Sequence, residues 1–158
     1  MYQVPCVLLA AMSEAVLERS VISYGAAVSA CEKAGEWQTT LVLLATMHKT
    51  VLRPNAISYN AAMSACEKGA AWQSALLLLA AMAAQGFFEP GVISYNAEIS
   101  ASEKSAEWQR AVALLSLLHR VALTPDTISY NAAMSACGKA FEGQRALALL
   151  AVESIADD

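Results

Sequence analysis

One repeated motif constrains the fold of this 158-residue chain more than any other feature. The tripeptide Ile-Ser-Tyr occurs four times, and its tyrosines are 35, 36 and 35 residues apart. Trp-Gln follows thirteen residues after the first three tyrosines, at Trp37, Trp72 and Trp108. A fixed period of this length is typical of proteins in which similar units stack on one another.

Each unit is predicted to form two helices. In the second unit the first helix is expected over about 57–68 and the second over 72–84, with Gly69 as a helix stop between them. A proline at 54, 90 or 125 then ends the unit. The predicted units are 21–55, 56–91, 92–126 and a nearly complete 127–158, and residues 1–20 match the second helix of a truncated unit. Positions within a unit are counted from its first residue, so position 1 is Val21, Ala56, Val92 or Thr127.

The repeat predicts the fold class. A single helix pair cannot bury its own apolar face, but stacked pairs can. The expected result is an all-α, right-handed α-solenoid with a concave face, forming a single array over residues 1–158. Asn55 and Asp126, which precede two of the first helices, are expected to help cap them.

Composition excludes several other classes of protein. Hydrophobic residues make up 57% and charged residues 15%, which excludes a disordered chain. The longest apolar run, 75–84, is about half of the roughly 20 residues that cross a bilayer, so no membrane association is expected. The net charge of −4 argues against a strongly basic nucleic-acid module. The placement of the ten positive residues therefore matters more than their sum.

The repeat resembles that of the pentatricopeptide repeat (PPR) family, of the 35-residue P type. The resemblance rests on Ile-Ser-Tyr-Asn-Ala-Ala-Met-Ser-Ala-Cys-Glu-Lys at 57–68, on Ala-Leu-x-Leu-Leu-x-x-Met at 75–82, and on Pro-Asn at 54–55 and Pro-Asp at 125–126. Tetratricopeptide repeats are the nearest rival, but their Trp-x-x-Leu-Gly-x-x-Tyr signature is absent.

This resemblance implies single-stranded RNA binding, with about one base for each repeat. In the family, position 5 and the last residue of a unit read the base, position 2 packs on the base, and a basic residue at position 13 lies near phosphate. The base-reading positions carried over are Gly25, Asn60, Asn96 and Asn131 with the last residues Asn55, Gly91 and Asp126. The base-packing residues are Ile22, Ile57, Ile93 and Ile128, and the phosphate-contacting residues are Lys33, Lys68, Lys104 and Lys139.

The chemistry of these residues is compatible with the assignment. Positions 2, 5, 9 and 13 are three or four apart and share one helix face. An asparagine amide donates and accepts, and a lysine column suits a phosphate chain. Only Asn96 with Asp126 forms a complete pair, of the kind that prefers uridine in the family. We therefore expect weak binding with a mild pyrimidine bias.

Simpler interpretations stand beside these. The lysine column can be a solvated face whose field is cancelled by the glutamates at the preceding position, which are Glu32, Glu67 and Glu103. The asparagines can be ordinary polar residues near helix starts. A helical scaffold that binds a protein or peptide in the same groove is the alternative function.

The remaining polar residues indicate structure rather than chemistry. Cys31, Cys66 and Cys137 share one repeat position and lack metal-site spacing, so they are expected in the core. His48 and His119 are expected at the surface, and the tryptophans between helices. Neither a catalytic set nor a cofactor or metal motif is recognised, so no enzyme is expected. The resemblance implies a role in organellar RNA processing or expression in chloroplast or mitochondrion, although no transit peptide is recognised.

Overall fold

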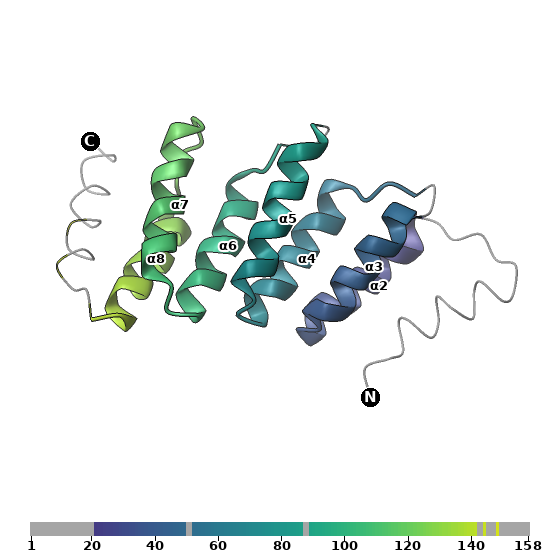
Figure 1. Cartoon of the computed structure of the whole chain (residues 1–158), viewed down its shortest axis with the longest axis horizontal. Helices are drawn as coiled ribbons and strands as arrows, with labels where there is room; N and C mark the ends of the chain where they lie inside the picture. The colour runs from purple at the N-terminus through teal and green to yellow at the C-terminus, as the bar shows by residue number, and fades with distance from the viewer. Residues whose placement is uncertain (1–20, 50–51, 87–88, 142–143, 145–147, 149–158) are drawn as a thin grey trace, which may run out of the picture.

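The computed structural model describes residues 21–49, 52–86, 89–141, 144 and 148 (Figure 1). These residues contain helices and connecting turns, and no strand is found among them. The predicted half unit over 1–20 and most of the second helix of the last unit lie outside the described residues. The helices are α2 (Val21–Ala34), α3 (Trp37–Lys49), α4 (Ala56–Lys68), α5 (Trp72–Gln85), α6 (Val92–Lys104), α7 (Trp108–Arg120) and α8 (Thr127–Lys139).

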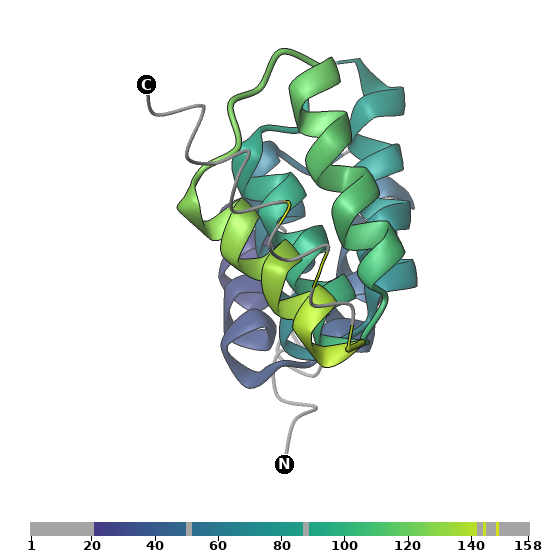
Figure 2. The same ribbon diagram turned by 90° about the vertical axis from the view of Figure 1, so that its left-hand side faces the viewer.

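The helices form two layers, as expected for an α-solenoid. The first helices of the units contact one another in chain order, α2 with α4, α4 with α6 and α6 with α8. Each second helix (α3, α5 and α7) contacts the first helix of its own unit and that of the following unit. Figure 2 views the stack from the end that carries α8, with α7 and α8 on different sides of it. The predicted all-α solenoid is confirmed.

Side-chain caps define where two of the first helices begin. The Asn55 carboxamide oxygen accepts from the Ser58 backbone N–H at 2.9 Å at the start of α4. The Asp126 carboxylate accepts from the Ser129 backbone N–H at 2.9 Å at the start of α8, and the Ser129 hydroxyl completes a capping box. The preceding Pro54 and Pro125 cannot extend a helix. The predicted capping by Asn55 and Asp126 is confirmed.

The core repeats with the sequence. The tyrosine of each Ile-Ser-Tyr is buried, and the second helices contribute leucines and methionines such as Leu43, Leu44 and Met47. Small residues of the first helices are also fully buried, namely Ala65, Ala101 and Ala136. The small side chains let the helix backbones approach closely. Cys31, Cys66 and Cys137 are buried, as predicted for core residues.

The turn between the helices of a unit does not depend on glycine. Gly35 has a φ of 71°, in the left-handed region, and Ala70, Ala106 and Phe141 adopt the same conformation at the equivalent place. Gly69 follows the last residue of α4, but its φ of −85° is accessible to any residue. A Cβ atom at Gly69 would instead lie 2.2 Å from Cδ1 of Trp37. Gly69 is therefore needed to admit the indole of the preceding unit.

The described helices are too short or too polar to cross a membrane.

The contact between Gly69 and Trp37 gives a stability prediction. Gly69→Ala should lower the free energy of unfolding by about 1–3 kcal/mol, the usual cost of overpacking. Gly138→Ala is the matched control, because a Cβ there meets nothing within 4 Å. That change should raise the free energy of unfolding by about 0.5–1 kcal/mol through helix propensity. Urea denaturation measures both, and equal stabilities for the two variants would contradict the packing role of Gly69.

Candidate nucleic-acid interface

The most exposed large apolar side chains of the first helices are the four position-2 isoleucines. Ile22, Ile57, Ile93 and Ile128 are 83%, 72%, 72% and 61% exposed. Each lies in the first turn of α2, α4, α6 or α8, two residues before a buried tyrosine. Because these four helices lie side by side, the isoleucines recur once per unit along one face. We name this face, made of positions 2, 5, 9 and 13, the first-helix stripe.

Position 5 of the stripe is tied to the next unit by a serine. The hydroxyl of Ser94 donates to the Asn60 carboxamide oxygen at 2.9 Å, and the hydroxyl of Ser129 donates to that of Asn96. The Asn96 amide also donates to the Asp126 carboxylate at 2.9 Å. Sequence resemblance pairs position 5 with the last residue of the unit, and the structure brings Asn96 and Asp126 together. At the other units this pairing is incomplete, because Gly25 at position 5 and Gly91 at the last position have no side chain. Asn131, at position 5 of the last unit, is exposed.

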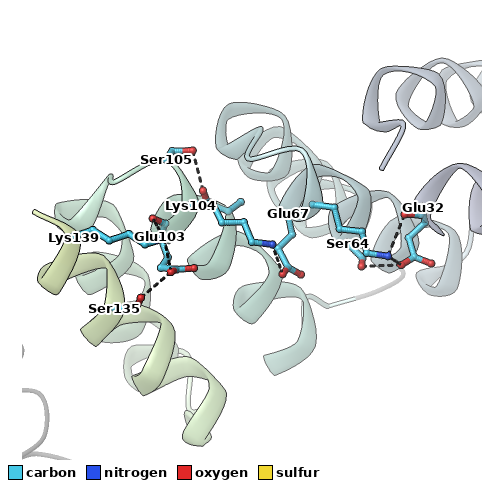
Figure 3. Close-up of polar contacts among 10 residues, drawn as sticks. Glu32, Ser64, Glu67, Glu103, Lys104, Ser105, Ser135 and Lys139 are labelled. Carbon is cyan, nitrogen blue, oxygen red and sulfur yellow. Dashed lines mark hydrogen bonds and ion pairs between the residues drawn. The ribbon is translucent and has the colours of Figure 1, made fainter. Parts of the chain in front are cut away.

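Three of the lysines at position 13 form ion pairs between neighbouring units. The ammonium of Lys68 lies 2.6 Å from a carboxylate oxygen of Glu32, that of Lys104 lies 3.0 Å from Glu67, and that of Lys139 lies 2.7 Å from Glu103. We call this row of three ion pairs the ion-pair ladder, and Figure 3 shows it crossing from helix to helix. Each lysine therefore pairs with the glutamate of the preceding unit, not with its own neighbour in sequence. Sequence reasoning identified the glutamates but not this pairing.

Serines at position 9 reinforce the ladder. Ser64 donates to the Glu32 carboxylate at 3.1 Å and Ser135 to the Glu103 carboxylate at 2.8 Å. The hydrogen bond from Lys68 is the main cause that lowers the pKa of Glu32. Partial burial opposes ionisation of Glu103, but its bonds from Lys139 and Ser135 outweigh that effect and lower its pKa. Both glutamates are therefore held as carboxylates.

The ladder changes what the lysines can do. All four lysines keep exposed side chains, so they remain accessible at the stripe. Three of them are already neutralised by carboxylates, and only Lys33 has no ion-pair partner among residues 21–49, 52–86 and 89–141. A phosphate chain would have to compete with the glutamates for these ammonium groups. The track of positive charge is weaker than four lysines alone suggest.

Two histidines join consecutive units on the other side of the first helices. His48 Nε2 lies 2.8 Å from the Tyr59 hydroxyl, and His119 Nε2 lies 3.4 Å from that of Tyr130. Both pairs also meet edge to face. The histidines are exposed, as predicted, but their tyrosine contacts were not foreseen. The equal spacing of eleven residues in both pairs is the signal that could have found them.

Glu98 departs from the repeat. Alanine occupies its position in the other units, at Ala27, Ala62 and Ala133, whereas Glu98 is fully buried. Its nearest charge is the Arg110 guanidinium at 3.8 Å, which also covers the Trp72 ring at 4.0 Å. Neither Glu98 carboxylate oxygen has a hydrogen-bond partner in the described part of the chain. Burial raises the pKa of Glu98 to about 7, and Arg110 only partly offsets this.

The raised pKa of Glu98 is expected to make the folded chain less stable as the pH rises. Above its ordinary pKa of 4.5 the unfolded chain releases this proton, while the folded chain keeps it up to about 7. Stability should therefore fall between these two values, by up to about 3 kcal/mol. The lowered pKa values of Glu32, Glu103 and Asp126 act in the opposite direction and at more acidic pH.

Thermal denaturation at pH 5 and pH 8 tests this. The wild-type chain should be less stable at pH 8, and Glu98→Gln should remove most of the difference, because an amide does not ionise. The exposed Glu89 supplies the control change, Glu89→Gln, which should leave the difference in place. A pH dependence that persists in Glu98→Gln would contradict the assignment.

Other chemistry is not assembled in the described residues. They contain no group of three or more histidine, cysteine, aspartate or glutamate side chains that could hold a metal ion. The pKa of the Cys66 thiol is raised by burial to about 11, which disfavours the reactive thiolate. The tryptophans predicted between helices, Trp37, Trp72 and Trp108, are half-buried and pack against the core.

Comparison with known proteins identifies the repeat. The sequence profile of the pentatricopeptide repeat domain matches residues 7–68 and 77–140. The chain belongs to the pentatricopeptide repeat family. The crystal structure of the PPR protein PPR10 from maize superposes with a TM-score of 0.77 at 22% identity, over 96% of this chain and 22% of that one.

A second PPR10 structure shows the same fold. PPR10 in complex with an 18-nt psaJ RNA element superposes with a TM-score of 0.75 at 17% identity, over 94% of this chain. This PPR chain spans 22% of the length of the PPR10 chains it resembles. No curated protein matches its sequence. The comparisons agree with the solenoid described above.

Proposed function

We propose that this PPR chain binds single-stranded RNA along the first-helix stripe. The observation that carries the proposal is the row of exposed isoleucines, one for each first helix, 61–83% exposed. Isolated apolar side chains at a surface need no explanation, but four at one repeat position on adjoining helices form a periodic apolar surface. A nucleic-acid strand is a ligand with the same kind of period, since each base offers an apolar face.

The similarity to PPR10 supports this proposal, because one PPR10 structure was solved in complex with an RNA element. By the same family reasoning, we propose that the chain acts as a binding protein rather than an enzyme. Its place would be in RNA processing or expression in a chloroplast or mitochondrion. In this proposal position 2 packs on bases, position 5 and the last residue contact base edges, and position 13 lies near phosphate.

The pair Asn96 and Asp126 supports a preference for uracil at its unit. An amide N–H beside an ionised carboxylate offers one donor and one acceptor. Uracil presents a carbonyl acceptor and an N–H donor side by side, so the two patterns match. Cytosine presents an amino donor and a ring-nitrogen acceptor, so its pattern is reversed. Partial burial opposes ionisation of Asp126, but the hydrogen bonds that it accepts from Ser129 and Asn96 outweigh the burial and lower the pKa of Asp126. The Asp126 carboxylate therefore remains a hydrogen-bond acceptor at neutral pH.

The ion-pair ladder gives the test of phosphate contact. Replacing Glu32, Glu67 and Glu103 together by glutamine frees Lys68, Lys104 and Lys139. Affinity for oligouridine, measured by fluorescence anisotropy, should rise. The slope of log K against log salt should also steepen toward about −3, because the three freed lysines join Lys33 and each of the four contributes about −0.7 on a single strand.

The matched control is Glu36→Gln, which removes a half-buried carboxylate at the start of α3 rather than on the stripe. It should change neither the affinity nor the slope appreciably. Unchanged RNA affinity in the triple variant would contradict phosphate contact by position 13. Undetectable binding of the wild-type chain to every homopolymer RNA would contradict the proposed function itself.

A further inference from the structure

The junction between the third and fourth units contains a closed set of hydrogen bonds around one amide. The Asn96 amide nitrogen lies 2.9 Å from an Asp126 carboxylate oxygen, and the Asn96 carboxamide oxygen contacts the Ser129 hydroxyl. The Ser129 hydroxyl in turn accepts from the Asp126 backbone N–H at 3.2 Å. Ser129 is fully buried, and Asn96 is 8% exposed.

The chemistry of the partners fixes which way this amide faces. An ionised carboxylate only accepts hydrogen bonds, so the Asn96 atom beside Asp126 must be the amide nitrogen. The carboxamide oxygen then faces Ser129, which has one proton to give. If Ser129 gave that proton to Asp126, whose oxygen lies 3.0 Å away, the buried Asn96 oxygen would lose this donor. The hydroxyl therefore donates to Asn96.

We propose that Ser129 is a positioning residue for base selection, which rests on the proposed RNA binding. Its hydroxyl holds the Asn96 amide from the acceptor side and occupies the carboxamide oxygen. Only the donor side of the amide and the Asp126 carboxylate are then offered to a base. Without the hydroxyl, the Asn96 oxygen is free to accept from the amino group of cytosine, and discrimination between uracil and cytosine weakens.

The other junctions lack one part of this set. Ser94 contacts the Asn60 oxygen at 2.9 Å, but the last residue of that unit is Gly91, which supplies no carboxylate. Without a carboxylate to exclude it, the Asn60 amide can present either group to Ser94, because a hydroxyl both donates and accepts. Ser58 follows a unit whose position 5 is Gly25, so it has no amide to hold. Among the junctions between the units that the structure describes, base selection is therefore confined to the one between the third and fourth units.

Serine-to-alanine variants test the role of Ser129. In Ser129→Ala the ratio of oligouridine to oligocytidine affinity should fall by about three- to tenfold, the effect of one net hydrogen bond. In the free protein, hydrogen exchange of the Asn96 side-chain amide, followed by NMR, should accelerate by a similar factor. Ser58→Ala is the matched control, because Ser58 also bonds to the residue that caps its helix. That variant should change neither readout.

A gain-of-function variant covers the case in which Ser129→Ala does not fold. Gly91 has φ −94° and ψ −179°, nearly the backbone conformation of Asp126 at −104° and 178°, and a Cβ there meets nothing within 4 Å. Gly91→Asp should therefore complete the set around Asn60 and raise the oligouridine-to-oligocytidine ratio. Adding Ser94→Ala to it should cancel the gain.

The outcomes separate the two proposals. RNA binding with an unchanged ratio in Ser129→Ala, or a gain in Gly91→Asp that survives Ser94→Ala, would overturn the role of the serine. Unchanged amide exchange in Ser129→Ala would overturn it even if no RNA is bound. Absence of RNA binding together with accelerated exchange would overturn the proposed function but leave the positioning of Asn96 by Ser129 intact.

Discussion

Side-by-side packing of the first helices is the constraint on which the rest of the structure depends. The first helices contact one another in chain order, and Ala65, Ala101 and Ala136 within them have no exposed surface. The repeated contact sets the offset between units at one repeat. The offset in turn places Lys68, Lys104 and Lys139 beside the glutamate of the preceding unit. It also places Ser94 and Ser129, at position 3, beside the position-5 asparagine of the preceding unit. Both sets of bonds are consequences of a single register.

Much of the fold could be predicted because the period reports stacking directly. The caps at Asn55 and Asp126 followed from local chemistry, and so did the burial of the cysteines. The partner of Lys104 could not be predicted, because Glu67 and Glu103 are equally good acceptors until the register between helices is known. The role of Gly69 was also missed. Its glycine requirement comes from Trp37, which lies in another unit, and not from its own backbone angles.

The third unit shows how far a repeat can depart from its pattern. Glu98 and Ser102 replace small residues one helical turn apart, and both are buried with side-chain oxygens that lack hydrogen-bond partners among the described residues. Arg110 accompanies this change, since it lies near Glu98 and stacks on Trp72 from the preceding unit. The same unit carries the complete pair of Asn96 and Asp126.

The central claim is that RNA lies along the first-helix stripe, and isoleucine methyl groups test it most directly. A titration of ¹³C-methyl-labelled protein with oligouridine reports each isoleucine separately. The account predicts shifts for Ile22, Ile57, Ile93 and Ile128, while Ile99, which is fully buried in α6, stays in place. A titration that leaves the four exposed isoleucines unmoved, and instead shifts labelled Val42 and Leu77 on the second helices, would contradict it.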